Sequence, residues 1–287
     1  MSIKTILAPL GGTPDCRSYL DVAFHLARTF DAHILGLHIQ PDPRAALPYI
    51  GEGMTAEVVQ QMCDLADKEG QERSKAAERL FHEAREAAGI PMLEGERRPG
   101  LTASWISRMG DQSETVALFG RIADITVVGR SDVSLDLPES GIKEGLLFRS
   151  GRPILFVPGK VETPFPRNVA VAWNGSVEAS RAVGNAIPLL KRAEKVEVLY
   201  AGETPLGAPS AEYLSAYFTY HGIEARLVEV TDRDSSTGEA LLNKTHDLGA
   251  DLLVMGAYTR SRLRQMLLGG VTSHMLEHAD LPVFMSH

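Results

Sequence analysis

Cysteine, long apolar runs and surplus positive charge are all scarce in this sequence. Cys16 and Cys63 are its only cysteines and no C-x-x-C is present, which excludes a disulfide framework and favours a reducing compartment. No apolar run approaches the ~18 residues of a membrane span, and the first residues lack the pattern of a signal peptide. Acidic residues outnumber basic ones by 37 to 29, so the formal net charge is −8. We therefore expect a cytoplasmic protein that binds neither nucleic acid nor a membrane.

The composition is that of a globular protein, and the length suits either two domains or one large α/β domain. Apolar residues make up 44% and charged residues 23% of the 287 residues, as is typical of folded proteins. Chains of this length commonly hold two domains of roughly 140 residues. Residues 158–167 contain three prolines, which suit a short and stiff linker. We expect one domain over residues 1–160 and another over residues 161–287.

Two sequence patterns occur once in each half. ILAPLGGT at 6–13 matches VAVAWNGS at 169–176, and ADITVVG at 123–129 matches ADLLVMG at 250–256. The first pair is offset by 163 residues and the second by 127, so the first half holds 163 − 127 = 36 additional residues between these patterns. We assign the additional residues to 41–89, a proline-containing loop followed by a long helix.

Apolar spacing predicts alternating strands and helices in both halves. In the first half we expect strand 3–10, helix 14–30, strand 32–39, helix 54–88, strand 91–97, helix 101–121, strand 123–129, helix 140–149 and strand 153–157. In the second half we expect strand 168–173, helix 177–192, strand 195–201, helix 209–221, strand 223–230, helix 236–248, strand 251–256, helix 270–278 and strand 281–286. This alternation predicts an α/β fold with a doubly wound parallel sheet in each half.

The ends of two strands in the second half are candidate ligand contacts, because open α/β sheets bind ligands at the carboxyl ends of their strands. Glycines there allow backbone N–H groups to approach an anion, and a helix N-terminus adds unpaired donors. Gly256 could instead simply end a strand, and Gly269-Gly270 could simply cap a helix. The candidate residues are Ala172, Asn174, Met255, Gly256, Tyr258, Thr259, Gly269, Gly270, Val271 and Thr272, with Arg260, Arg262 and Arg264 between them.

These residues and the internal repeat resemble the universal stress protein family in its tandem two-domain form. Its nucleotide-binding members carry G-x2-G-x9-G-(S/T) after the fourth strand, and Gly256 and Gly269 match two of these positions. The resemblance implies two Rossmann-like domains of the adenine nucleotide alpha hydrolase type. It also implies that the strands near 154–157 and 283–285 pair, so that the halves form a pseudo-dimer. The implied ligand is an adenine nucleotide such as ATP, with Mg²⁺ as its companion.

Three positions depart from the family pattern. Thr259 replaces the second glycine and has a branched Cβ, which disfavours a positive φ. Gly270 replaces the Ser or Thr but keeps the N–H that a phosphate uses. Asn174 stands where the family has Asp, so it can hydrogen-bond to the nucleotide but is a poor ligand for Mg²⁺.

The first half departs further from the pattern. Gly11 occupies the position of the Asp, and Asp132, Asp136 and Glu139 would repel a triphosphate. We expect this half to be a degenerate partner domain.

His274 and His278 lie four residues apart on a helix, but no third metal ligand is evident. We expect no catalytic residue and no metal site formed by the protein alone.

Three functions remain open at this point. The chain could be a stress-response or signalling module that binds ATP in its second half, with at most slow hydrolysis. It could be a scaffold that binds no nucleotide and acts through an unknown protein partner. It could be a nucleotide-dependent enzyme, although no catalytic motif supports that reading. Two chains could also form a homodimer, for example through the helix at 54–88.

Overall fold

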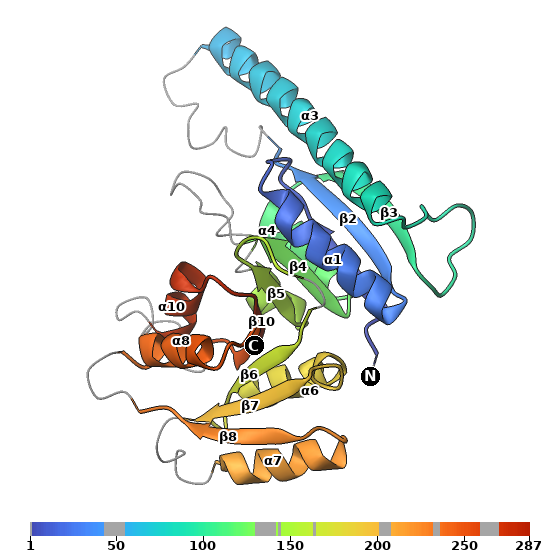
Figure 1. Ribbon diagram of the computed structural model, residues 1–287. Helices are drawn as coiled ribbons and strands as arrows, with labels where there is room; N and C mark the ends of the chain where they lie inside the picture. Colours follow the sequence, from blue (N-terminus) through green and yellow to red (C-terminus); the bar gives the residue numbers. More distant parts are fainter. Residues whose placement is uncertain are drawn as a thin grey trace. The chain divides into compact units, whose positions relative to one another are not determined.

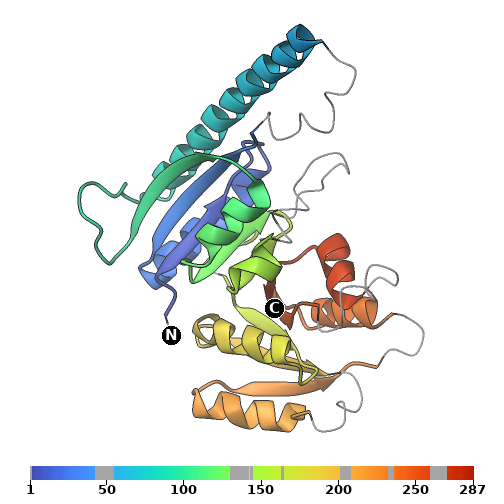
Figure 2. The same ribbon diagram turned by 180° about the vertical axis from the view of Figure 1, so that it is seen from behind.

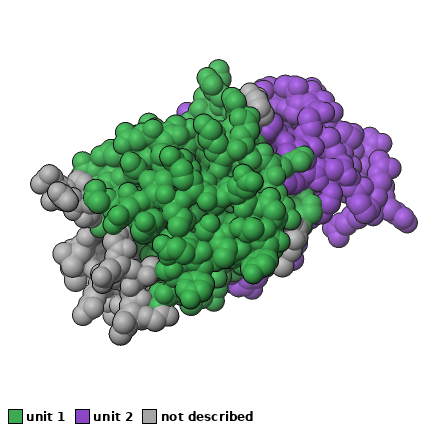
Figure 3. All heavy atoms as spheres, turned by 60° about the horizontal axis from the view of Figure 1, so that its bottom comes forward, with its two compact units in different colours: residues 1–3, 128–132, 151–287 green, residues 4–127, 133–150 purple. Residues whose placement is uncertain are grey.

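The computed structural model describes residues 2–42, 55–129, 142, 145–162, 165–200, 208–231, 236–258 and 270–287. The chain divides into two compact units, which Figure 3 shows in different colours. Unit 1 consists of Met1–Ile3, Val128–Asp132 and Gly151–His287, and unit 2 of Lys4–Val127 and Val133–Ser150. The predicted domain limits at residue 160 follow the sequence repeat and stay a prediction.

Unit 2 is a parallel sheet with helices on both faces. Its elements are β1 (Thr5–Pro9), α1 (Cys16–Phe30), β2 (His33–Gln40), α3 (Ala56–Ala87), β3 (Thr102–Met109), α4 (Gln112–Gly120), the first residues of β4 (Ile125–Gly129) and the π-helix η2 (Leu146–Ser150). The strand order is β3-β2-β1-β4, and each neighbouring pair is parallel. Helices α1 and α3 cover one face (Figure 1), and α4 covers the other (Figure 2).

Unit 1 has the same arrangement with one antiparallel strand pair. Its elements are β5 (Ile154–Val157), β6 (Asn168–Ala172), α6 (Val177–Leu190), β7 (Lys195–Tyr200), α7 (Ala211–Tyr220), β8 (Ala225–Glu229), α8 (Thr237–Asp247), β9 (Leu252–Gly256), α10 (Val271–His278) and β10 (Val283–Ser286). The strand order is β5-β10-β9-β6-β7-β8. Strands β5 and β10 run antiparallel, with Phe156 opposite Val283. This pair confirms the expected contact between the last strands of the two sequence halves.

An aromatic cluster holds the long helix α3 against the sheet of unit 2. The ring centroid of Phe81 on α3 lies 5.4 Å from those of both Phe24 and Trp105. A Cβ on Gly36 in β2 would come within 2.6 Å of the Phe81 ring. A glycine is therefore needed at this position for the rings of Phe81 and Trp105 to pack against the strand.

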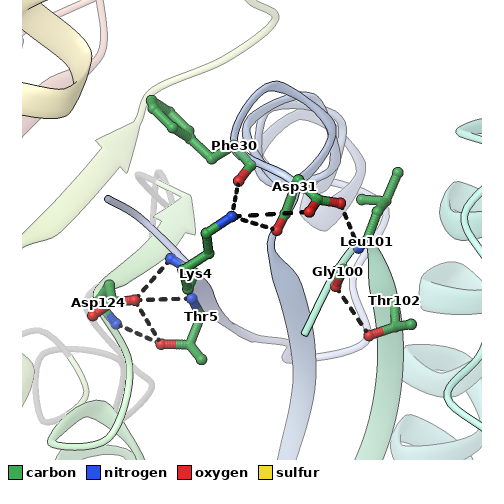
Figure 4. A network of polar contacts seen from close by, with 8 residues as sticks. All are labelled: Lys4, Thr5, Phe30, Asp31, Gly100, Leu101, Thr102 and Asp124. Carbon is green, nitrogen blue, oxygen red and sulfur yellow. Dashed lines mark hydrogen bonds and ion pairs between the residues drawn. The ribbon is translucent and has the colours of Figure 1, made fainter. Parts of the chain in front are cut away.

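The repeated A-D pattern has the same structural role in both units. Oδ2 of Asp124 accepts hydrogen bonds from the backbone N–H of Lys4 at 2.8 Å and of Thr5 at 3.0 Å (Figure 4). Asp251 likewise accepts from the N–H groups of Arg167 at 2.8 Å and Asn168 at 3.0 Å. Each aspartate thus joins the start of its own strand to the start of the first strand of its half. Burial raises the pKa of the Asp251 carboxyl, and these N–H groups oppose that rise.

A lysine adds a second contact at this edge of unit 2. The Lys4 ammonium donates to the carbonyl oxygens of Phe30 at 2.9 Å and Asp31 at 3.2 Å, where α1 ends (Figure 4). Helix C-termini attract cations because their last carbonyl groups are unpaired. The Asp31 side chain accepts the N–H of Leu101 at 2.9 Å, which ties the approach to β3 to the same corner.

Two sequence predictions in the first half were wrong. Residues 101–121 are not one helix, because β3 occupies Thr102–Met109 and α4 begins only at Gln112. The expected strand 91–97 is reduced to one bridge, between Met92 and Ala103. Pairing with β2 along eight residues overrides the helical spacing of this segment. Of the expected helix 140–149, Leu146–Ser150 forms the π-helix, and most of the remainder lies outside the described residues.

We predict that Asp251→Ala lowers the free energy of unfolding by about 1–3 kcal/mol, because two backbone N–H groups lose their acceptor. Asp251→Asn should cost less, since it keeps one oxygen. The exposed Asp247 on α8 is the matched control, and its alanine variant should stay within about 0.5 kcal/mol of the wild type. Urea unfolding measures all three, and an unchanged midpoint for Asp251→Ala would contradict the role of the carboxylate.

Candidate functional site

The carboxyl ends of β6 and β9 form the candidate site in unit 1. The strands are parallel neighbours with Val171 opposite Val254, so Ala172 and Gly256 end at the same edge of the sheet. The structure therefore brings together the two segments that the sequence predicted. The Met255 side chain is buried in the core, so only its backbone can face a ligand.

Gly256 in β9 lies against the first turn of α6. A Cβ at this position would lie 2.5 Å from the backbone nitrogen of Ala179 and 2.9 Å from the Cβ of Glu178. Real Cβ atoms do not approach backbone atoms this closely, so any larger residue must displace the first turn of α6. The structure thus gives a packing reason for glycine here, independent of any ligand.

The turn between β6 and α6 is held by its own side chains. Asn174 Oδ1 accepts the N–H of Ser176 at 3.1 Å, and Ser176 Oγ accepts the N–H of Ala179 at 3.1 Å. Gly175 between them has φ 71°, a conformation that side chains disfavour. Asn174 is exposed, and within the described part of the chain its amide nitrogen has no recorded partner. That nitrogen is available to a ligand.

A hydrogen bond joins the end of β9 to the start of α10. The N–H of Tyr258 donates to Thr272 Oγ1 at 3.0 Å, and Tyr258 has the left-handed φ of 54°. The buried Thr272 hydroxyl is therefore already engaged by the protein. Thr259, Gly269 and the three arginines at 260, 262 and 264 lie outside the described residues.

The first turn of α10 is open to an acceptor. Gly270 is its N-cap and has no side chain to accept the N–H groups that follow, and no capping hydrogen bond from a side chain is recorded there among the described residues. Val271 and Thr272 begin the helix directly beside Tyr258. Helix N-termini of this kind carry unpaired donors and a partial positive charge, which favour an anion.

One contact of this region was not predicted from the sequence. His287 Nδ1 lies 2.9 Å from the carbonyl oxygen of Ala257, the residue between Gly256 and Tyr258. The N–H of Ala257 donates in turn to Ser286 in β10 at 2.8 Å. No local pattern links residue 257 to residues thirty positions away, so this contact follows from the pairing of β9 with β10 alone.

The equivalent turn of the first half is covered by a helix. Gly12 corresponds to Gly175 by the offset of 163 residues and has a similar φ of 86°. A Cβ on Gly12 would lie 2.5 Å from the carbonyl oxygen of Arg73, so the backbone of α3 rests on this turn. Over Gly175, the nearest atoms belong to Ala208 and Pro209. The two halves thus share a turn but differ in what covers it.

The histidine pair on α10 forms a stack. The rings of His274 and His278 lie 4.4 Å apart with an interplanar angle of 16°. Among the described residues, no group of three or more His, Cys, Asp or Glu side chains is placed to hold a metal ion.

No helix in the described part of the chain is long and apolar enough to cross a membrane.

These features define a class of protein before any comparison: a repeated, doubly wound α/β fold with an anion-suited strand edge in its second half. The universal stress protein family model matches residues 166–287. A universal stress protein from Archaeoglobus fulgidus aligns over 99% of this chain and 96% of its own, with a TM-score of 0.67 and 18% identity. A protein of unknown function from Pseudomonas aeruginosa aligns over 99% and 92%, with a TM-score of 0.53 and 17% identity. No curated protein matches the chain.

Residues 166–287 match the universal stress protein family, and the N-terminal strand order β3-β2-β1-β4 repeats the order β8-β7-β6-β9 of that segment. The structural matches are below 25% identity and therefore speak for the fold alone. The predicted tandem, Rossmann-like architecture is confirmed.

We predict that Gly256→Ala destabilises the protein by about 1–3 kcal/mol, because the added methyl group overpacks the first turn of α6. Gly184, in the same helix, is the matched control: it is exposed, and nothing lies within 4 Å of an added Cβ. Gly184→Ala should stabilise by about 0.5–1 kcal/mol, since it removes chain entropy from the unfolded state. Equal effects of the two substitutions in thermal or urea unfolding would refute the packing role of Gly256.

Proposed function

We propose that the second half of this universal stress protein binds an adenine nucleotide, with ATP as the expected ligand. One observation carries the proposal: the hydrogen bond between Tyr258 and Thr272 joins the carboxyl end of β9 to the first turn of α10, which has no side-chain cap. Family membership of residues 166–287 supports the same ligand class.

The two neighbouring turns suit different parts of a nucleotide. The first-turn N–H groups of α10 would receive phosphate oxygens, because Gly270 leaves them without a side-chain cap. The amide nitrogen of Asn174 would donate to the base or the ribose. Asn174 carries no charge, so Mg²⁺ accompanying the nucleotide would be held mainly by phosphate oxygens and water.

We propose a binding role in stress response or signalling, in the cytoplasm, with at most slow hydrolysis. A nucleotide that binds the folded form shifts an equilibrium of conformation or assembly by mass action. In the first half the backbone of α3 rests on the turn at Gly12. We therefore propose one nucleotide per chain.

We predict that Gly270→Asp weakens ATP binding at least about tenfold while leaving the fold intact. An Asp at this N-cap would accept the first-turn N–H groups itself and repel phosphate, and Asp is a favoured N-cap residue. Gly270 has φ −76° and ψ 169°, which Asp adopts readily. Isothermal titration with ATP and Mg²⁺ measures the affinity, and thermal unfolding measures the fold.

Thr55→Asp is the control for the added charge, because Thr55 caps α3 in the other unit. It should leave ATP affinity unchanged. If the wild type binds no adenine nucleotide at millimolar concentration, the nucleotide proposal fails and the scaffold function takes its place. If Gly270→Asp binds ATP as tightly as the wild type, a site exists elsewhere.

A further inference from the structure

A histidine bridges two hydroxyl groups on the sheet of unit 2. His33 Nδ1 on β2 lies 2.8 Å from Thr102 Oγ1 on β3, and His33 Nε2 lies 2.9 Å from Ser104 Oγ on the same strand. We call these three side chains the histidine–hydroxyl group. Its members lie 69 and 71 residues apart in the sequence, so no local motif marks them. A serine within hydrogen-bond reach of a base, with a third group orienting that base, is the arrangement that activates a hydroxyl nucleophile.

The histidine–hydroxyl group lies on the face of the sheet that points away from α3. Gly36 on β2 and Trp105 on β3 lie against the ring from α3. Side chains alternate between the two faces of a strand, so Ser104, one residue before Trp105, and His33, three before Gly36, point the other way. Helix α4 packs on this second face at β1 and β2 (Figure 2), and β3 is the edge strand. His33 and Ser104 are partly exposed there, so a small molecule can reach them.

The hydrogen bonds of this group run in one direction. The Thr102 hydroxyl donates to the carbonyl oxygen of Gly100 at 3.4 Å (Figure 4), and a carbonyl oxygen can only accept. Thr102 has a single hydroxyl hydrogen, so its oxygen accepts the Nδ1–H of His33. The other ring nitrogen, Nε2, therefore carries the lone pair and accepts the hydrogen of Ser104. This tautomer is the one that a base acting on Ser104 requires.

The surroundings of His33 keep the ring ready to accept a proton. Burial, and to a lesser degree the positive charge of Arg97, lowers the pKa of the His33 imidazole, so the ring is uncharged at neutral pH. Leu35 lies opposite Ser104, and Ile106 is the next residue of β3 on the same face. Both are partly exposed. They offer a short apolar group a place to lie beside the Ser104 hydroxyl.

We propose that Ser104 is a nucleophile that takes an acyl group from a carboxylic ester, with His33 as its general base and Thr102 as a positioning residue. Ser104 Oγ forms a bond to the carbonyl carbon of the ester, and its hydrogen passes to His33 Nε2. The bond between that carbon and the alcohol oxygen then breaks, and His33 gives the proton to the leaving alcohol. The products are an acyl ester on Ser104 and a free alcohol, and the His33 ring is uncharged again.

The chemistry of the three side chains limits the substrate to activated esters. A positioned general base accelerates a reaction by about 10²–10⁴-fold. Donors aimed at the oxyanion would add about 10²–10³-fold, but the hydroxyl hydrogens of this group are already engaged by His33 and Gly100. We therefore expect reaction with esters of a good leaving group and a short acyl chain.

Incubation of the full chain with p-nitrophenyl acetate, followed by mass mapping of its peptides, tests the nucleophile. Ser104 should be acetylated at least about 100-fold faster than Ser107. Ser107 is the matched control: it lies on the same strand, its hydroxyl meets Ser74 instead of a histidine, and it is more exposed. Exposure alone would therefore favour Ser107. Equal acetylation of the two serines in the wild type overturns the proposal.

Two variants test the base. His33→Gln should reduce the acetylation of Ser104 to the rate of Ser107, because glutamine cannot take the proton. Ser107→Ala should leave the acetylation of Ser104 unchanged. Urea unfolding midpoints like that of the wild type would show that the variants are folded. Undiminished acetylation of Ser104 in a folded His33→Gln variant overturns the role of His33 as the base.

The ¹⁵N chemical shifts of the His33 ring test the positioning role of Thr102. We expect the hydrogen on Nδ1 in the wild type, and a hydrogen on Nε2 would overturn the proposed direction of the hydrogen bonds. Thr102→Val removes the acceptor of that hydrogen, so it should shift the ring toward the other tautomer and slow the acetylation of Ser104 at least about tenfold. Thr102→Ser keeps the hydroxyl and should preserve both. Acetylation at the wild-type rate in Thr102→Val overturns the positioning role.

Discussion

In each half, an aspartate at the start of the fourth strand fixes where the neighbouring first strand begins. Asp251 accepts the N–H groups of Arg167 and Asn168, which fixes where β6 begins relative to β9. Because strands rise by a constant amount per residue, a fixed start determines the relative position of the far ends. Ala172 and Gly256 therefore end at the same edge, and the candidate nucleotide site depends on a carboxylate at the opposite end of the strands.

The sequence predicted the elements well where the pattern was repeated. The two A-D motifs predicted β4 and β9 correctly. In each half the aspartate of the motif accepts hydrogen bonds from backbone N–H groups at the start of the first strand. The prediction was wrong at β3, where an edge strand carries both exposed and buried residues. Its β-branched and aromatic residues favour a strand. The capping contact from Asp111 to the N–H of Glu114 marks where the helix really starts. Both features are local and compete with the helical spacing of residues 101–121. Pairing with β2 decides in favour of a strand.

The candidate site was predictable in position but not in detail. Strand order brings the predicted segments together, and that order follows from the fold class. The use of each group depends on packing that no local pattern reveals. Gly256 is required by the approach of α6, and the Thr272 hydroxyl is taken by Tyr258. Asn174 Oδ1 accepts the N–H of Ser176 within the turn, so the amide nitrogen is the atom that can meet a ligand. The site therefore offers N–H donors more than side-chain oxygens, which suits an anion better than a cation.

Duplication of the fold accounts for the difference between the halves. Gly12 and Gly175 keep the same left-handed turn, so the backbone of the two copies has been retained. In the first copy the α3 backbone lies over that turn, while in the second copy Ala208 and Pro209 lie over it. Helix α3 has 32 residues and packs on the sheet of unit 2 through apolar side chains, among them Phe81 over Gly36. Helix α3, which Phe81 anchors on Gly36, therefore also covers the turn of the first half.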